Sequence, residues 1–488
     1  MKNFSKSLDR LIGYAKTYLM LSSRDETLVR NRIMSELGLS YYNGSGKARK
    51  NSVALGELLN ELGEALINEG LFSKEEIPQV NDKIMGILLP LPSAIEKKFN
   101  RLEKESPEKA TDFLYNIGIS AGYIKKEALD KNPRFSEGRL SLSINKTKPE
   151  YSDPKKALKG SAVKGGYPAC TICRENEGNS LSLKSTLRTI GLKLGQEDWF
   201  WQFSPYGYFN QHGIAVNQKH TPMKINASTV SKLLDFIDRF PHYFIGCNAA
   251  LPRIGGSVLA HDHFQGGKEV LPIHSAPLLK EFHCKDYPNA KIGIIDWPIS
   301  SLRIKSNDRG VIEKLGARLI ESWLGYENKA IGIIPSDESG QHNSLSPIVR
   351  KEGSSYLLTI VFRSNYANLE YPDGVFVARP EYQIIKKESV GLIEAQGLFI
   401  LPGRLDEELK LLAKLLASGS ELPEEMKGFS YIYNELKEIK PAALSEDEAY
   451  KRVKKEAGSV CERILENNSV FKNEKDFSAF LLQSGLVE

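Results

Sequence analysis

The stretch GGSVLAHDHFQGG, residues 255–267, constrains this 488-residue chain more than any other part of its sequence. Two histidines and a glutamine, His261, His263 and Gln265, alternate in a mostly apolar run between two pairs of glycines. Alternation with a period of two predicts a β-strand, which we expect over residues 257–265. On a strand the three side chains share one face, with successive members about 6.5 Å apart, so they can converge on one small group.

The glutamine separates two chemical interpretations of the histidine pair. A His-x-His pair by itself also suits a metal-dependent hydrolase. Glutamine is a poor metal ligand, whereas its amide N–H groups donate readily to a phosphoryl oxygen. The pattern therefore favours chemistry at phosphorus. The alternative, a pair of structural histidines on a half-buried strand, leaves Gln265 without a role.

A second motif, Cys170-x-x-Cys173, has the spacing of half a zinc site. A structural Zn²⁺ takes four nitrogen or sulfur ligands, so two more must come from elsewhere in the chain. Five cysteines, an odd number in a long chain, do not suit a small scaffold held by disulfides. The pair therefore indicates metal or redox chemistry, with two unligated reduced thiols as the alternative.

Composition excludes several classes of protein. With 41% hydrophobic and 26% charged residues the chain has the balance of an ordinary globular protein, and its length predicts about two to four domains. No apolar run approaches the roughly 18 residues that span a membrane, and the N-terminal segment is polar throughout, unlike a secretory signal. We therefore expect a cytoplasmic protein with no membrane partner. A net charge of +5, without aromatic residues among the basic ones, predicts no nucleic-acid partner.

Periodicity changes along the chain. Apolar residues recur at helical spacing over residues 8–19 and 55–66, which predicts a helix-rich N-terminal domain over residues 1–145. A linker with many turn formers follows at residues 146–166. Beyond it, short β-rich runs alternate with helical stretches and the C-terminal part returns to helix, which indicates an α+β fold. The runs that we expect as strands, besides that over 257–265, are 213–216, 244–247, 330–334 and 356–362, with helices over 229–240 and 405–416.

The motif HDHFQGG resembles the active-site strand of galactose-1-phosphate uridylyltransferases, which are histidine-triad proteins with a His-x-His-x-Gln signature. Four further segments resemble the class II form of this family, so that the similarity runs from Val29 to Leu405: VRNRIMSELGL, YPACTICRENEG, WQFSPYGYFNQHGIAVNQKHTPMKI and KKESVGLIEAQGLFILPGRL. The resemblance implies a duplicated histidine-triad-like α/β core with an antiparallel sheet. Residues 167–290 would form the first half, with the zinc and the catalytic strand. Residues 291–488 would form the second, with a sugar-side segment and C-terminal helices.

The resemblance also implies roles for individual residues. Class I relatives bind zinc through a matching set, which places a structural Zn²⁺ on Cys170, Cys173, His220 and His261. His263 becomes the nucleophile, because a covalent nucleotidyl-imidazole divides the exchange of a nucleotidyl group into two similar displacements. A neutral imidazole, with an ordinary pKa of about 6.5, suits this role.

The remaining candidates bind substrate. Gln265 would donate to one phosphoryl oxygen, and backbone N–H groups near Gly255 and Gly256, together with Ser257, would donate to others. Asn248 resembles an asparagine that contacts the nucleotide phosphates. The segment KESVGLIEAQG resembles the hexose-binding segment, with a solvated turn as the alternative. In class I enzymes this segment comes from the other subunit, which implies a homodimer. Its candidate residues are Lys387, Val390, Glu394 and Gln396.

The implied function is a step of galactose metabolism. UMP would pass from UDP-glucose to galactose 1-phosphate, giving UDP-galactose and glucose 1-phosphate by ping-pong kinetics. Two alternatives stand beside it. One is a nucleotide-sugar or dinucleotide phosphorylase or hydrolase of the same superfamily. The other is a zinc-stabilised nucleotide-binding protein without turnover, against which the retention of His261, His263 and Gln265 argues.

Two segments depart from familiar patterns. Class II members have a histidine-rich segment where this chain reads FVARPEYQIIKKES, residues 376–389, so Arg379 and His342 would take different roles and acceptor choice would change. Because His274, His283 and His342 lack ligand spacing, we expect no additional transition-metal site in the C-terminal half. The run NGSGKARK, residues 43–50, lacks the first glycine and the Ser or Thr of a phosphate-binding loop, and we expect an exposed loop.

Overall fold

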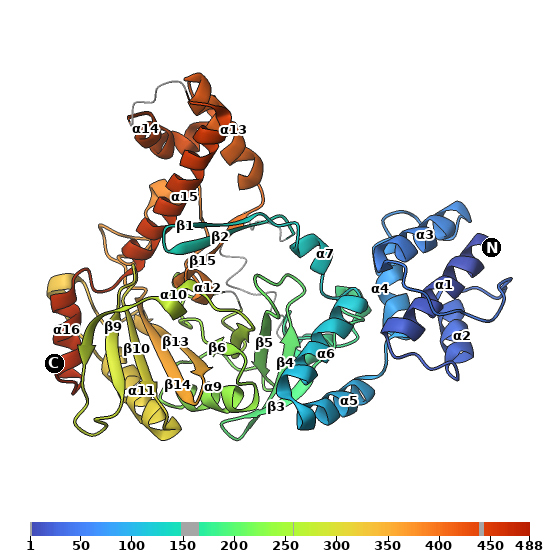
Figure 1. Cartoon of the computed structure of the whole chain (residues 1–488), viewed down its shortest axis with the longest axis horizontal. Coiled ribbons are helices and arrows are strands. Elements are labelled where there is room, and N and C mark those ends of the chain that lie inside the picture. The colour runs from blue at the N-terminus through green and yellow to red at the C-terminus, as the bar shows by residue number, and fades with distance from the viewer. Residues whose placement is uncertain (1, 148–164, 257, 439–443) are drawn as a thin grey trace. The chain divides into compact units, whose positions relative to one another are not determined.

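The computed structural model describes residues 2–147, 165–256, 258–438 and 444–488 (Figure 1). They fall into two compact units. Unit 1 comprises Met1–Lys126, Val163–Leu192 and Phe200–Gly207, and unit 2 comprises Glu127–Ala162, Lys193–Trp199 and Tyr208–Glu488. Of the predicted linker 146–166, residues 148–164 lie outside the described residues.

Unit 1 is built mainly from helices, as the periodicity predicts. The predicted stripe over residues 8–19 lies on the first helix, where Leu8, Leu11 and Ala15 have no exposed surface. The stripe over 55–66 lies on the third helix. The helices up to residue 129 are α1 (Lys2–Tyr18), α2 (Glu26–Glu36), α3 (Leu55–Asn68), α4 (Ile77–Leu88), α5 (Pro92–Glu105), α6 (Pro107–Ser120) and α7 (Lys126–Leu129).

A ten-stranded sheet runs through the remainder of the chain in the order β3-β4-β5-β7-β6-β13-β14-β10-β9-β8. Every strand pair of this sheet whose register is described is antiparallel. Its strands are β3 (Ile190–Leu194), β4 (Glu197–Phe203), β5 (Gly213–Asn217), β6 (Phe244–Gly246), β7 (His263–Gly267), β8 (Leu278–Phe282), β9 (Lys291–Ile295), β10 (Ser301–Ser306), β13 (Asn343–Glu352) and β14 (Ser355–Ser364).

The strand order shows an internal duplication. The first five strands pair in the order 3-4-5-7-6 and the second five in the order 8-9-10-14-13, so the two sets repeat one another. Each set inserts one long helix before its last two strands in sequence, α9 (Ser228–Arg239) in the first and α11 (Arg309–Leu324) in the second. The two sets join where β6 pairs with β13. The predicted α+β fold, with a duplicated core after a helical N-terminus, is confirmed.

Helices cover one face of the sheet and a second apolar layer covers the other. In Figure 1, α9 and α11 run along one side of the sheet, and both contact its strands β13 or β14. The opposite face packs into an apolar core with the small sheet β1-β2-β15 and the C-terminal helices. These elements are β1 (Arg134–Glu137), β2 (Leu140–Asn145), β15 (Leu398–Pro402), α10 (Pro272–Ser275), α12 (Leu392–Ala395), α13 (Leu405–Ser418), α14 (Ser430–Glu438) and α15 (Glu446–Asn468). The last helix, α16 (Glu474–Gln483), packs instead beside α11, where Phe480 contacts Trp323.

Two predicted strands differ from the structure. The strand expected over 257–265 begins only at His263, because a turn precedes it in which the His261 amide donates to the Val258 carbonyl. The run 330–334 is not a strand: a short 3-10 helix, Lys329–Ile331, is followed by Gly332 with a φ of 77°. A reversal of this kind overrides the β propensity of the apolar residues around it. A two-stranded ribbon, β11 (Ser336–Asp337) and β12 (Gly340–Gln341), follows.

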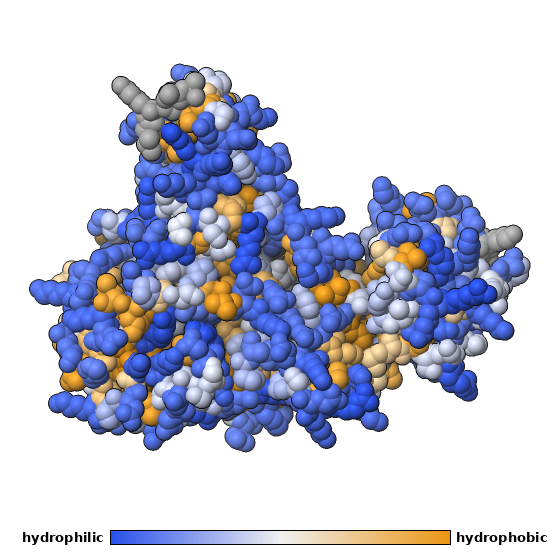
Figure 2. Space-filling model, viewed as in Figure 1, coloured by the Kyte–Doolittle hydropathy of each residue, from blue (hydrophilic) through white to orange (hydrophobic). Residues whose placement is uncertain are grey.

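The molecular surface is mainly hydrophilic on the face drawn in Figure 2, with hydrophobic residues in separate areas. Single apolar side chains such as Leu181 and Leu369 are highly exposed. Within the described residues, every helix is too short or too polar to cross a membrane.

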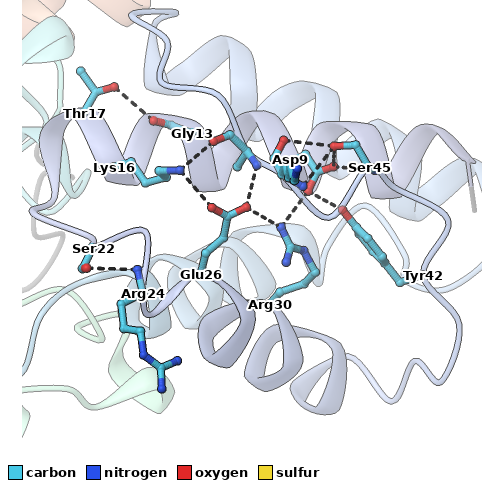
Figure 3. Close-up of polar contacts among 12 residues, drawn as sticks. Asp9, Gly13, Lys16, Thr17, Ser22, Arg24, Glu26, Arg30, Tyr42 and Ser45 are labelled. Atoms are coloured by element: carbon cyan, nitrogen blue, oxygen red, sulfur yellow. Dashed lines mark hydrogen bonds and ion pairs between the residues drawn. The ribbon is translucent and has the colours of Figure 1, made fainter.

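Buried charges hold the loop 43–50 of unit 1 in place (Figure 3). The Glu26 carboxylate accepts hydrogen bonds from the Ala48 amide at 2.6 Å, from Lys16 at 2.9 Å and from Arg30 at 2.9 Å. Lys16 also donates to the Ala48 carbonyl at 2.8 Å. The loop has no regular secondary structure, as predicted, but Ala48 at its centre is buried because Glu26 and Lys16 together satisfy its backbone.

Asp9 anchors the beginning of the same loop. Its carboxylate accepts hydrogen bonds from Arg30 at 3.1 Å, from the Ser45 amide at 3.2 Å and from the Tyr42 hydroxyl. Burial, together with the hydrogen bond to Asp9, raises the pKa of Tyr42 to about 12. The phenol therefore stays protonated and remains a donor to Asp9.

The Glu26 network makes a prediction for stability. Burial alone would raise the pKa of Glu26, but the Ala48 amide and the two cations, Lys16 and Arg30, outweigh it and lower that pKa below its ordinary value. A carboxylate with a depressed pKa contributes stability above its unfolded pKa of about 4.3, and this stability is lost as the pH falls through the folded pKa. Glu26→Gln removes the carboxylate that pairs with Lys16 and one of the two that pair with Arg30, so we expect local unfolding of α1 and α2 to become easier by about 3–5 kcal/mol.

Hydrogen exchange of the Ala48 amide and of α2, measured against pH, checks this prediction. In the unsubstituted chain, protection should fall in acid, whereas Glu26→Gln should have low protection with little acid dependence. Glu36→Gln is the matched control, because Glu36 pairs with Lys83 at 2.9 Å on the surface, and such a pair is worth about 0–1 kcal/mol. Equal effects of the two substitutions would contradict a special role for the buried network.

Candidate functional site

Strand β7 carries the candidate nucleophile and lies between β5 and β6. Its register pairs Gly266 with Gly213 on one side and with Ile245 on the other. A Cβ atom at Gly266 would overlap the Phe244 carbonyl oxygen, so only glycine lets the neighbouring strand approach this closely. The second glycine pair of the motif thus serves the packing of the sheet.

The same register determines which side chains lie on the face of the sheet that carries His263, here called the active face. Ile214 pairs with Gln265 and Val216 with His263, and paired residues on neighbouring strands point to the same side. His212, directly before β5, continues this alternation. Side chains of the segment 212–216 and of β7 therefore share one face of the sheet, and Asn248 follows two residues after Gly246, which pairs with Gln265.

His263 has a defined tautomer. Its Nδ1 lies 2.8 Å from the carbonyl oxygen of His261, which can only accept, so Nδ1 carries the proton. The side chain is buried, and burial lowers the pKa of His263 below its ordinary value. At neutral pH the ring is therefore uncharged, with its lone pair on Nε2. This nitrogen is the one that can act as a nucleophile or a base.

Gln265 is held by a histidine that sequence reasoning missed. The Nε2 atom of His212 lies 3.3 Å from the Gln265 amide oxygen, and the Tyr208 amide donates to His212 Nδ1 at 3.4 Å. His212 belongs to the segment WQFSPYGYFNQHGIAV and stands immediately before a predicted strand. Its alternation with Ile214 and Val216 was the available signal for its place on the active face.

The opposite face of β7 packs toward α9. Phe264 stacks on Trp199 with ring centroids 4.7 Å apart, and Lys232 of α9 lies over the Trp199 ring. Asp262 lines a polar cavity of about 300 Å³ on this side, and burial raises its pKa to about 6. These contacts fix the strand that presents His263.

Four predicted metal ligands form one cluster: Cys170, Cys173, His220 and His261. Each offers one ligand atom, and these atoms all lie within 4.8 Å of one another, so the cluster could hold a metal ion. His261 Nε2 donates to the Asn217 carbonyl at 2.7 Å, which leaves the lone pair of the neutral ring on Nδ1. Asn217 in turn donates through its side chain to Glu197 at 3.2 Å, an outer contact typical of metal-binding histidines.

The two thiols need a cation to ionise. Their sulfur atoms are 3.3 Å apart and both residues are buried. The pKa of the Cys173 thiol is raised far above its ordinary value, mainly by burial and to a smaller extent by the neighbouring Cys170. Two adjacent thiolates would repel one another in this environment, and a bound divalent cation is the usual way to offset such charge.

Asn248 lies between the glycine pair that precedes β7 and the predicted hexose segment. Its Oδ1 accepts a hydrogen bond from the Leu392 amide at 2.8 Å, and a Cβ at Gly256 would lie 2.6 Å from its Nδ2. Gly255 lies against the backbone of Ala249 and Ala250. The predicted phosphate-side glycines and the segment around Leu392 therefore meet at Asn248 within one chain. Ser257 lies outside the described residues.

Three of the four predicted hexose-side residues have partners inside the fold. Glu394 pairs with the buried Lys386 at 3.0 Å and caps the Gly391 amide at 3.1 Å. Gln396 is fully buried and its Oε1 lies 3.0 Å from His274 Nε2. Val390 is buried and its carbonyl accepts from Arg363 at 2.9 Å. Only Lys387 is exposed.

The other histidines beyond β7 lie apart from one another. His274 bonds to Gln396, His283 is exposed, and His342 lies 2.9 Å from Asn365 and 3.0 Å from Asp337. Arg379, in the histidine-poor segment, lies over the ring of Tyr371. Among the described residues, the Cys170 cluster is the one group of three or more such side chains close enough to hold a metal ion.

Comparison with known proteins shows the family of this chain. The sequence profile described as "Galactose-1-phosphate uridyl transferase, N-terminal domain" matches residues 20–222. A galactose-1-phosphate uridylyltransferase of Bifidobacterium longum is 43% identical, over 99% of this chain and 98% of that protein. One of Clostridium acetobutylicum is 38% identical, over 87% and 88%. Among solved structures, the yeast Ap4A phosphorylase Apa2 covers 63% of this chain and 84% of its own, at 9% identity and a TM-score of 0.34.

The similarity to the relative from Bifidobacterium longum extends over essentially the whole length of both chains. The chain therefore belongs to the galactose-1-phosphate uridylyltransferase family of nucleotidyltransferases.

Proposed function

We propose that this enzyme transfers a uridylyl group from UDP-glucose to galactose 1-phosphate through a covalent intermediate on His263. The observation that carries the proposal is the tautomer of that ring. Because Nδ1–H donates to the His261 carbonyl, Nε2 bears a lone pair, and the ring lies on the same face of β7 as Gln265. The names of the relatives supply galactose 1-phosphate and the transfer of a uridylyl group, and UDP-glucose as the donor is what the family resemblance implies.

The two half-reactions balance without a general acid. In the first, the Nε2 lone pair attacks the α-phosphorus of UDP-glucose, and the bond to the β-phosphate oxygen breaks to release glucose 1-phosphate. In the second, a phosphate oxygen of galactose 1-phosphate attacks the same phosphorus, and the P–N bond breaks. Both the leaving group and the acceptor are phosphate oxygens, so no proton has to move. The Nδ1–H remains bonded to the His261 carbonyl, which stabilises the charged, phosphorylated ring.

Hydrogen-bond donors near His263 can stabilise the negative charge on the phosphoryl oxygens. The Gln265 amide is placed beside His263 to donate to one oxygen. Backbone N–H groups near Gly255 and Gly256 can donate to others, and the Asn248 Nδ2 lies next to Gly256. Preorganised donors of this kind are most effective where charge increases in the transition state.

The hexose would bind on the side of the segment 387–396. Lys387 is the exposed cation of that segment and suits the sugar phosphate, whereas Val390, Glu394 and Gln396 would act by shaping the backbone around Leu392. Because Leu392 reaches Asn248 in the same chain, this placement needs no second subunit. The homodimer stays a prediction from the resemblance.

A structural Zn²⁺ fits the donor set of the cluster. Two thiolates and two imidazoles match the tetrahedral preference of zinc, and all four donors belong to short connecting segments. Zinc there would neutralise the thiolates and fix His261, which directly precedes the strand of His263. Its contribution in this proposal is to hold the strand and not to take part in the transfer.

Isotope labelling tests the covalent mechanism. Without acceptor, UDP-glucose labelled at the α-phosphorus should leave label on the protein that survives mild base and is lost in acid, because a phosphoramidate behaves in this way. His263→Asn should abolish labelling and turnover while the fold remains. His283→Asn, at an exposed histidine, is the matched control and should label normally. Exchange of label between UDP-glucose and glucose 1-phosphate in the His263→Asn variant would refute the mechanism.

The acceptor that takes the uridylyl group distinguishes a transferase from a phosphorylase or a hydrolase. The labelled protein should pass its uridylyl group to galactose 1-phosphate much faster than to inorganic phosphate or water, as rapid-quench release shows. Faster release to phosphate or water would indicate a phosphorylase or hydrolase instead. A protein that binds UDP-glucose without ever taking up label would indicate the non-catalytic alternative.

Metal analysis tests the zinc site. We expect about one Zn²⁺ per chain, and Cys173→Ser should lose it and unfold at lower temperature, because the ligands come from separate segments. Cys461→Ser is the control, since Cys461 is a buried thiol of α15 outside the cluster and should leave the zinc content unchanged. Unchelated protein without zinc would contradict the assignment.

A further inference from the structure

We propose that His212 is a positioning residue that fixes the side-chain amide of Gln265 with its NH₂ group turned toward the phosphoryl site at His263. The inference rests on the proposed function and adds to it a residue that no motif singles out. Its geometry comes from β5 and β7, which present His212 and Gln265 as diagonal neighbours on one face.

The hydrogen bonds of His212 leave one possible arrangement. The Tyr208 amide can only donate, so His212 Nδ1 must accept at 3.4 Å. A neutral imidazole has one N–H, which is then on Nε2, 3.3 Å from Gln265. A donor at this place requires an acceptor opposite it. The Gln265 amide therefore presents Oε1 to His212, and its two N–H donors lie on the other side of the amide group.

Packing keeps His212 in this state. Only 4% of the residue is exposed, and the rings of Tyr208 and Phe209 lie against its ring with centroids 5.1 and 4.6 Å away. Burial lowers the pKa of His212 to about 4, with the bond to Gln265 as the smaller, opposing effect. The ring is therefore neutral at neutral pH and cannot offer a second N–H.

Fixing the amide matters because the two ends of a glutamine side chain have nearly the same shape. An amide that is free to rotate by half a turn would direct Oε1, an acceptor, at an anionic phosphoryl oxygen for part of the time. The oxygen would then repel the charge that the N–H groups stabilise. The contribution of His212 is thus to the transition state, and we expect its loss to lower kcat with little change in KM.

Labelling rates in four forms of the full-length protein test the proposal, with α-labelled UDP-glucose as the probe. Gln265→Ala should slow labelling by about 100- to 1000-fold, the range for one lost preorganised donor. His212→Phe keeps the ring volume without the donor and should slow labelling by at least about 10-fold, but by no more than Gln265→Ala does. The double variant should be no slower than Gln265→Ala, because His212 acts through Gln265. His212→Gln restores an N–H donor and should recover much of the rate.

A second histidine–glutamine pair provides the control for general damage to the fold. His274 also accepts from a backbone amide, that of Leu271, at 3.2 Å and meets Gln396 at 3.0 Å, but it lies apart from β7 at α10. The effects of His274→Phe and Gln265→Ala should multiply in the double variant. If the effects of His212→Phe and Gln265→Ala also multiply, or His212→Gln recovers nothing, His212 does not act through Gln265 and the proposal is wrong.

Nitrogen NMR of ¹⁵N-histidine protein separates this inference from the proposed function. It should show His212 protonated on Nε2 and not on Nδ1 throughout the neutral pH range, with the resonance assigned by its absence from His212→Phe. A proton on Nδ1 would overturn the inference even in an enzyme that labels normally. If the unsubstituted protein takes up no label, the covalent mechanism fails, and the Nε2 proton still supports the bond from His212 to Gln265.

Discussion

The pairing of β7 between β5 and β6 is the constraint on which the site depends. Main-chain hydrogen bonds on both edges fix its register, and Gly266 is needed because the Phe244 carbonyl occupies the space of a side chain. A slip by one residue would move every side chain of the strand to the other face. His263 and Gln265 would then point toward α9, away from His212.

Burial determines the chemistry of the histidines on this face. For both His212 and His263 it lowers the pKa, so each ring is neutral with one N–H at neutral pH. In each case a backbone group decides which nitrogen carries that proton. The His261 carbonyl accepts a hydrogen bond from His263 Nδ1–H, whereas the Tyr208 amide donates one to His212 Nδ1, so that the proton of His212 is on Nε2. Two rings of one residue type thus have different roles in the proposed mechanism: His263 would present a lone pair to the substrate, and His212 an N–H to Gln265.

The two five-stranded sets of the sheet differ in the motifs that they carry. Their strands repeat in order, yet the motif with two histidines and a glutamine belongs to β7, while the corresponding strand β14 reads SYLLTIVFRS. The second half supplies the neighbouring strand β13 and the segment that reaches Asn248 through Leu392. A duplication of this kind lets one copy keep the reacting group while the other completes the sheet and its covering layer.

Sequence alone determined much of this protein. The alternation in residues 255–267 indicated which side chains share a face, helical periodicity located α1, α3, α9 and α13, and the spaced motifs indicated the family. Local periodicity could not show that the strand starts only at His263, or that residues 330–334 reverse direction at Gly332, since turns and cross-strand bonds decide both. The tertiary structure alone decided that His212 holds Gln265, that Leu392 meets Asn248, and which nitrogen of His263 has the lone pair. Those contacts join residues distant in sequence, and their hydrogen bonds exist only once the strand register has brought them together.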